Sequence, residues 1–416
     1  MSATGPLGPS NPFDGFGMFG DLARMLSSQG PLHWDAARQM ALMLANEASS
    51  DTNVDPLVRI KWEELGRIAE LHIQHVSGLD TSANGHPAVV VPVTPVIWAD
   101  RTLTAYRPLF ERLAGALHPP TVDPTVAVDP AGPPGAVDPF SSGADDDADT
   151  DTDTAMISGL FQLLGPSLLG MSAGSMIGHL ARRNFASYDL PLPRPVSPEL
   201  LVIDRNVTAF ADDWSLPIDD VRLWVCLSEL AHHAVLSGPH VRAALEDLLG
   251  RFVAGFRPQP DALAQRLGDL EMGDAGPESL QRLFADPQVM LGAMASPEQR
   301  ALEPALDALV AVLLGYVDHA LDEASRGLVA SGSRIAEATR RRRIEAGQSN
   351  QFVERLFGLS LSRQQVERGH AFVSGVLERA GDTGLTQLWR DARNLPTPAE
   401  VDAPGLWLAR LEIDPT

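Results

Sequence analysis

An acidic, proline-rich segment divides this chain and limits where a folded core can form. Residues 118–154 contain seven prolines and nine aspartates, and no lysine or arginine occurs between Arg112 and Arg182. Such a segment buries too little apolar surface to offset the entropy of ordering it, and its like charges repel one another. We therefore predict a disordered acidic linker over residues 119–154, with folded parts before and after it.

The composition of the whole chain excludes several classes of protein. Of its 416 residues, 44% are hydrophobic and 21% are charged, which is typical of a globular protein. The formal net charge of −22 opposes binding to a phosphate backbone, so we predict no nucleic-acid partner. The N-terminus lacks the pattern of a signal peptide, and the single cysteine, Cys226, suits a reducing compartment. These features predict a cytoplasmic protein.

The part before the linker is predicted to be helical. Residues 1–20, rich in Gly, Pro and Phe, are expected to form a flexible arm, and residues 21–118 an N-terminal helical region. Apolar residues recur at helical spacing from Trp34, and after Pro56 a second run is expected to share much of one helix surface. That run consists of Ile60, Leu65, Ile68, Leu71 and Ile73. Residues 89–96 are β-branched but interrupted by prolines, which predicts an edge strand or an extended connection.

Residues 156–181 carry no formal charge and are long enough to cross a bilayer. Their many glycines and serines keep the mean hydropathy low for a spanning helix. Gly170, Gly174 and Gly178 recur at the spacing that lets two helices approach closely. We therefore predict a buried helical hairpin and no membrane span.

The C-terminal part, residues 155–416, is predicted to be one mainly helical (α+β) domain with a small β element. Residues 200–210 are the best strand candidate, with Asp204 to Asn206 as a possible hairpin turn. The remainder shows helix starts and helical periodicity, including helices from Pro217, from Pro239 and from the Ser296 capping box. Shorter helices are expected at residues 334–346, 351–357, 363–380 and 385–391.

The most informative motif lies in the helix predicted after Pro217. Ser228 and His232 are four residues apart and share a helix face, with Glu229 beside them. With His in place of Ser228 the segment would read H-E-L-A-H, in which two histidines hold zinc and the intervening glutamate activates a bound water.

At this point the sequence resembles the zincin-like metallopeptidases common in actinobacteria, which include zinc-dependent metalloproteases and hydrolases. The resemblance runs from about Leu160 to the C-terminus. It is carried by residues 188–193 (YDLPLP), 206–210 (NVTAF), 223–233 (LWVCLSELAHH), 315–318 (GYVD), 341–343 (RRR), 356–359 (LFGL), 388–389 (LW), 395–397 (LPT) and Trp407.

The resemblance implies a zinc site whose third ligand is a glutamate before the GYVD element, and this chain has Leu314 there. Two of three implied ligands are therefore replaced, by Ser228 and Leu314, while His232 and Glu229 match. Because a catalytic zinc normally needs three protein ligands, we predict no zinc or other cofactor. Glu229 then becomes a vestigial general base. The predicted function is an inactive metallopeptidase homologue that binds a protein or peptide partner.

Three alternatives remain open. Glu229 could join His232 or His233 in a rearranged metal site of an active hydrolase, with Asp318 and His319 as accessory residues. Ser228 could serve as a nucleophile, although no G-x-S-x-G motif surrounds it. The arginine run at residues 340–343 could contact a nucleic acid or an anionic membrane surface, but pairing with carboxylates of the fold or of a partner is the simpler expectation for so acidic a chain.

Overall fold

The computed structural model describes residues 32–46, 53–117, 166–167, 169–256, 296–344, 348–359 and 361–413. The predicted N-terminal arm and acidic linker lie outside these residues. The helices are α2 (Trp34–Asn46), α3 (Pro56–Ser77), α4 (Pro95–Ala105), α5 (Arg107–Leu117), α7 (Asp204–Asp213), α8 (Ile218–Leu236), α9 (Pro239–Ala254), α13 (Pro297–Ser325), α14 (Gly332–Ile344), α15 (Gln348–Phe357), α16 (Arg363–Leu385, kinked at Gly381), α17 (Pro398–Asp402) and α18 (Pro404–Ile413). The strands are β1 (Val89–Pro92) and β2 (Glu199–Val202), and a 3-10 turn spans Ala392–Asn394. This is the mainly helical fold with a small β element that the sequence predicts.

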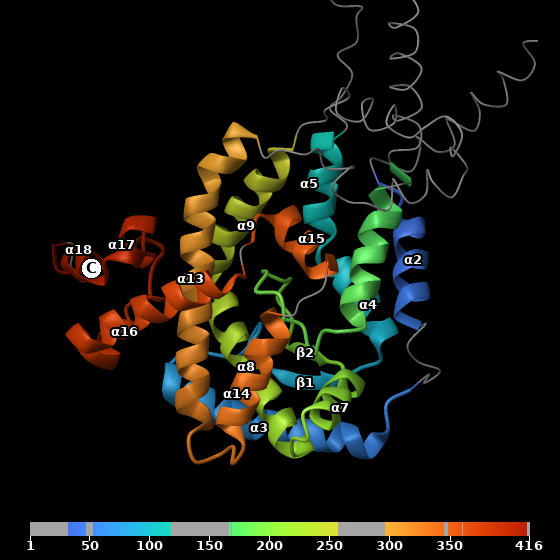
Figure 1. Ribbon diagram of the computed structural model, residues 1–416, viewed down its shortest axis with the longest axis horizontal. Coiled ribbons are helices and arrows are strands. Elements are labelled where there is room, and N and C mark those ends of the chain that lie inside the picture. The colour runs from blue at the N-terminus through green and yellow to red at the C-terminus, as the bar shows by residue number, and fades with distance from the viewer. Residues whose placement is uncertain are drawn as a thin grey trace, which may run out of the picture.

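Two long helices, α8 and α13, form the centre of the fold (Figure 1). Helix α8 is buried on nearly every side from Val221 onward because α3, α13, α7 and α9 surround it. Helix α13 packs against α8 on one side and crosses α16 on another. Among the described residues, α13 alone is long and apolar enough to cross a membrane, and 72% of its most apolar window is buried inside the protein. It is therefore a core helix of this fold.

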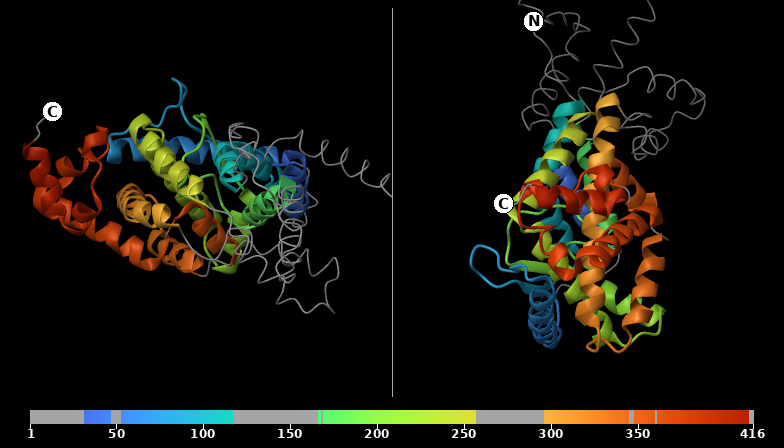
Figure 2. Two further views of the ribbon diagram at one scale, coloured as in Figure 1. Left: turned by 90° about the horizontal axis from the view of Figure 1, so that it is seen from above. Right: turned by 90° about the vertical axis from the view of Figure 1, so that its left-hand side faces the viewer.

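The N-terminal helices share this core. Helix α3 packs on α8 and α13, and α5 packs on α9 (Figure 2). Residues 169–181 form a helix beside α2, where a Cβ on Gly170 or Gly174 would overlap a backbone carbonyl of α2 or of the residue before it. The glycine spacing thus serves close helix packing inside the protein, as predicted. Residues 156–165 lie outside the described part.

The prediction of a strand or hairpin over residues 200–210 is wrong beyond Val202. Strand β2 pairs in parallel with β1, with Val89 opposite Glu199, and α7 begins at Asp204. A helix forms here in place of a strand because Val207, Phe210 and Ala211 then place their side chains on one buried face. Asp204, in the first helical turn, accepts hydrogen bonds from Trp62 Nε1 (2.7 Å) and Arg222 Nε (2.9 Å).

The other edge of β2 is also occupied. Ala186 forms an antiparallel bridge with Val202, and the Ser187 hydroxyl bonds the backbone N–H and C=O of Leu201. The strand therefore lies between β1 and this segment, and neither of its edges is open to an added peptide strand.

Two further expectations about helices differ from the structure. No helix forms over residues 385–391, because α16 ends at Leu385 and turns follow. In α3 the predicted apolar run does not share one face. Leu65 and Ile73 are buried, whereas Ile60 and Leu71 are 52% and 69% exposed.

Candidate functional site

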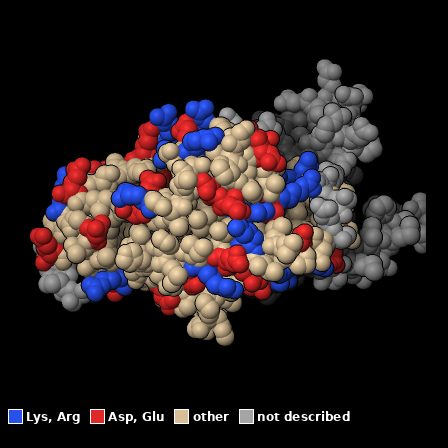
Figure 3. All heavy atoms as spheres, turned by 90° about the horizontal axis from the view of Figure 1, so that it is seen from below, with Lys and Arg blue, Asp and Glu red and all other residues tan. Residues whose placement is uncertain are grey.

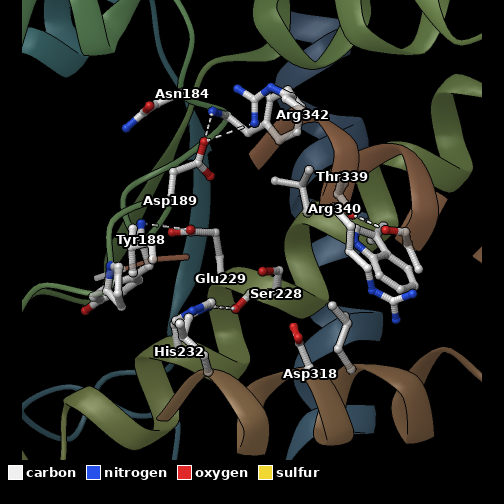
Figure 4. A pocket seen from close by; sticks show the side chains of 18 of the residues that line it. Asn184, Tyr188, Asp189, Ser228, Glu229, His232, Asp318, Thr339, Arg340 and Arg342 are labelled. Atoms are coloured by element: carbon white, nitrogen blue, oxygen red, sulfur yellow. Dashed lines mark hydrogen bonds and ion pairs between the residues drawn. The ribbon is translucent and has the colours of Figure 1, made fainter. Parts of the chain in front are cut away.

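A cavity of about 120 Å³ lies between α8, α13, α14 and the loop of residues 183–191 (Figure 4). Five of the residues singled out from the sequence line it, namely Ser228, Glu229, His232, Leu314 and Asp318. His233 and His319 do not line it. Other lining residues include Tyr188, Asp189, Trp224, Asp322, Thr339, Arg340 and Arg342.

Helical geometry explains why these residues converge. Ser228 and His232 lie one turn apart on α8, and Leu314 and Asp318 lie one turn apart on α13. Because α8 and α13 pack against each other, the two pairs face one cavity although about eighty residues separate them. The positions that the resemblance assigns to zinc ligands are therefore neighbours in this fold.

Glu229, in the wall of the cavity, binds the backbone of the neighbouring loop. It is 2% exposed, and its carboxylate accepts hydrogen bonds from the backbone N–H groups of Ser187 (3.1 Å) and Tyr188 (2.8 Å). Burial raises the pKa of Glu229 to about 8, and the Asp189 carboxylate adds to this rise, against the opposing effect of the two N–H groups and Arg194. Glu229 thus anchors the loop that closes one side of the cavity.

His232 and His233 make different contacts. The Nδ1 of His232 lies 2.8 Å from the Ser228 carbonyl oxygen, which can only accept, so the neutral ring carries its proton on Nδ1. The His232 ring stacks on Tyr188 with centroids 6.2 Å apart. His233 faces away from the cavity, with its Nδ1 3.2 Å from the Tyr188 hydroxyl. Burial lowers the pKa of His233 to about 4, so it is neutral at neutral pH.

The α13 side of the cavity is acidic. Asp318 and Asp322 lie one turn apart, and burial together with the Asp318 carboxylate raises the pKa of Asp322. Arg340 opposes this rise from α14. The Nε2 of His370 on α16 lies 3.9 Å from an Asp318 oxygen.

Arg342 connects α14 to the loop of residues 183–191 on the opposite side of the cavity. The sequence analysis did not single this residue out from the arginine run. Its guanidinium donates to the Arg183 carbonyl oxygen, lies 3.6 Å from an Asp189 oxygen and stacks 3.6 Å over the Phe185 ring. Asp189 in turn accepts a hydrogen bond from the Phe185 N–H (2.7 Å). Helix α14 is thereby fastened to the loop that Glu229 anchors.

A second hollow, of about 490 Å³, adjoins the cavity, since Arg340 and Leu361 line both. It runs between α14 and α16, with Leu361 and Val366 as apolar lining and with two ion pairs on its walls. These pairs join Arg341 to Glu337 and Arg363 to Glu367, both at 2.7 Å.

The donor set of the cavity does not fit a zinc ion. Leu314 has no lone pair, a neutral serine hydroxyl is a poor ligand, and His232 alone supplies a suitable nitrogen. Within the residues that the structure describes, no three His, Cys, Asp or Glu side chains come together as metal ligands.

Comparison with known proteins shows the class of the fold. The sequence matches the zincin-like metallopeptidase family over residues 32–408, so this chain belongs to that family. The match begins well before Leu160, where the sequence analysis placed its start, because α2 to α5 are part of the family's fold. A crystal structure from Chloroflexus aurantiacus, described as a putative hydrolase with a novel fold, is similar with 21% identity and a TM-score of 0.59. The similarity covers 92% of this chain and 99% of that one. No curated protein matches.

Proposed function

We propose that this chain is a metal-independent member of the zincin-like family that acts by binding a protein or peptide segment. The observation that carries the proposal is the donor set Ser228, His232 and Leu314 at the three positions that the resemblance assigns to zinc. With one imidazole nitrogen in place of three ligands, the cavity lacks the chemistry to retain a catalytic zinc.

The engagement of Glu229 supports the same proposal. A general base needs a carboxylate directed at the molecule that it deprotonates. Both carboxylate oxygens of Glu229 instead accept backbone N–H groups of the loop at Ser187 and Tyr188. The residue at the position of the base therefore serves the fold.

The two adjoining hollows supply the binding surface. Addition of a peptide strand beside β2, a common mode of peptide recognition, is blocked because both edges of β2 are occupied. One side chain of the bound peptide can enter the cavity beside Asp318 and Asp322. The flanking residues of the peptide then lie along the second hollow, between α14 and α16. The carboxylates of α13 favour a basic side chain at the inner end.

A hydrolase with a rearranged metal site is the second candidate. It is favoured by Asp318, Asp322 and His370, which lie near one another beside the cavity. In the described part of the chain these three side chains do not come together as metal ligands, so such a site requires a change of conformation.

Metal analysis separates these candidates. We expect protein purified without chelator to retain far less than one zinc per chain after dialysis, and to cleave no peptide library. The double variant Ser228→His, Leu314→Glu should then bind about one zinc, because it completes a two-His, one-Glu set. The matched control Ser228→Ala, Leu314→Met should bind none while remaining folded by circular dichroism. One zinc per wild-type chain, or metal-dependent peptide cleavage, would contradict the proposal.

Binding is tested with an array of peptides of varied charge. Asp318→Lys should weaken the capture of basic peptides about tenfold or more, since it reverses charge inside the cavity. Asp247→Lys, on an exposed position of α9, is the matched control and should leave capture unchanged. Equal capture by the wild type and both variants would exclude the cavity as the binding site.

A further inference from the structure

An apolar stripe covers the outward face of α3. Of the nine large hydrophobic side chains that the described part of the chain exposes, four lie on this helix. They are Leu57 (73% exposed), Ile60 (52%), Ile68 (39%) and Leu71 (69%). At 100° per residue these four side chains fall within a sector of about 80°, so they form one line along the helix. The inward face is separate and complete, with Trp62, Leu65, Ala69 and Ile73 buried against the core.

The stripe has a two-fold pattern in its sequence. Counted from Glu64, isoleucines stand four residues away on each side and leucines seven residues away on each side. An antiparallel helix pair related by a two-fold axis brings residue i of one copy opposite residue 128 − i of the other when the axis passes Glu64. Leu57 then meets Leu71 of the second copy, and Ile60 meets Ile68. The same side chains supply both halves of the interface.

We propose that two copies of this chain associate through α3, packed antiparallel about a two-fold axis at Glu64. This proposal is independent of the function assigned to the cavity, which lies on other elements.

Charge at the centre of the stripe agrees with this register. Glu64 alone would meet its own copy across the axis, and like charges there are unfavourable. Lys61 and Arg67 flank it at three residues on either side, so the register sets Lys61 of one copy level with Arg67 of the other, and the two Glu64 side chains lie between these cations. Within one copy, Lys61 lies 3.0 Å from Asp219 and Arg67 lies 3.8 Å from Glu63, both at exposed positions.

The extent of the stripe sets the expected affinity. The span from Leu57 to Leu71 is about 21 Å at 1.5 Å per residue. A helix pair of this length falls at the low end of specific interfaces, about 1,200 Å² in total, where weak and transient complexes are found, so we expect a reversible dimer. Figure 3, which shows the side of the protein on which α3 lies, has wide uncharged areas between groups of charged residues. With a net charge of −22, association with an anionic membrane is disfavoured.

Sedimentation velocity of the full chain over about 1–200 µM tests the association. We expect a reversible monomer–dimer equilibrium in the wild type, and at least a tenfold weaker dimer in Ile60→Glu and in Ile68→Glu. Both positions are exposed, so the variants should keep the thermal melting temperature. Met43→Glu on α2 and Leu406→Glu on α18, which are 53% and 58% exposed, are matched controls and should dimerise like the wild type. A wild type that stays monomeric throughout, or controls that weaken the dimer equally, would overturn the proposal.

Cross-linking tests the register. The only native cysteine, Cys226, is buried, so one introduced cysteine is the only reactive thiol of the folded chain. Glu64→Cys should form a disulfide-linked dimer under mild oxidation. Leu57→Cys and Leu71→Cys should each cross-link poorly alone and readily when mixed, because each faces the other across the interface.

Two outcomes would exclude this arrangement. Efficient cross-linking of Leu57→Cys alone would indicate parallel or different pairing. Binding of the monomer to neutral or anionic vesicles that Ile68→Glu abolishes, without any dimer in solution, would assign the stripe to a membrane instead.

Discussion

Replacing Glu229 by glutamine tests whether this buried carboxyl is a structural anchor with a raised pKa. The substitution keeps the shape of the side chain and removes its proton equilibrium. One of the two backbone N–H groups at Ser187 and Tyr188 then loses its acceptor, because the amide group of glutamine offers only one oxygen. An unsatisfied buried donor costs about 1–3 kcal/mol, so the variant should be less stable than the wild type by that amount at pH 6.

The difference should shrink as the pH rises. In the unfolded chain the carboxyl titrates near 4.5, whereas in the folded protein burial raises its pKa to about 8. Between these values the folded state holds a proton that the unfolded state has released, so wild-type stability falls with increasing pH and the fall ends above about pH 8. At about 1.4 kcal/mol per pH unit, with levelling near the folded pKa, the loss from pH 6 to pH 8 is about 2 kcal/mol. Glutamine removes this contribution.

Urea unfolding of both proteins at pH 6, 7 and 8 gives the measurement. Other titrating groups, such as His233, change the free energy of unfolding of wild type and variant alike. The difference in this free energy between the two proteins therefore reports on Glu229. Glu400→Gln is the matched control: burial would raise the pKa of Glu400, but hydrogen bonds from Arg410 and Thr397 lower it overall. That variant should be destabilised by a similar amount at all three pH values. A gap between wild type and Glu229→Gln that does not narrow by pH 8 would refute the reasoning.

Three further predictions concern the rest of the fold. Arg342→Ala should destabilise the protein by about 2–4 kcal/mol in urea unfolding, because it removes a stacked, hydrogen-bonded and ion-paired guanidinium from between α14 and the loop; an effect below about 0.5 kcal/mol would contradict its role as a fastener. Gly369→Ala should cost about 3 kcal/mol or more because its Cβ would overlap the Ala311 carbonyl at the crossing of α13 and α16, whereas Gly115→Ala, in open space on α5, should stabilise by about 0.5–1 kcal/mol; similar thermal shifts for the two would be inconsistent with this packing. Limited proteolysis should cut first within residues 119–154, and equal protection of that segment and the helices would count against the predicted linker.

The helical elements could be predicted because their signals are local. Periodicity and capping residues marked the helices from Trp34, Pro56, Pro239 and Ser296, and the Ser296 capping box is present in the structure. The helix after Val202 could not be predicted in this way. Its β-branched residues favour a strand locally, whereas the tertiary contacts of Val207 and Phe210 favour a helix. Likewise the sequence could not show which apolar residues of α3 face outward, since apolar residues occupy both its exposed stripe and its buried face.

The residues of the site were predictable where they share a helix turn. Ser228 and His232, one turn apart on α8, follow from spacing alone, and the family resemblance added Leu314 from α13. The conformation of the loop at residues 183–191 could not be predicted from the sequence. The hydrogen bonds that fix it join residues about forty positions apart, for example Tyr188 and Glu229. Arg342 lies still farther from its partners, and nothing in a run of four arginines distinguishes the one that turns inward.

The position of Glu229 leads to a last prediction about the zinc-binding double variant. Ser228→His and Leu314→Glu change the ligand positions but leave the contacts of Glu229 with Ser187 and Tyr188 in place. The loop that supplies those N–H groups is fastened to α14 through Arg342, so the carboxylate, although it lines the cavity, cannot leave these N–H groups for a bound water unless the loop moves as well. We therefore expect the double variant to bind zinc and still cleave no peptide. Adding Arg342→Ala to the double variant should loosen the loop. If the held carboxylate is what prevents peptide hydrolysis, this triple variant should be the one that hydrolyses peptides. Rapid peptide hydrolysis by the double variant alone would show that the hydrogen bonds of Glu229 do not hold it away from the chemistry.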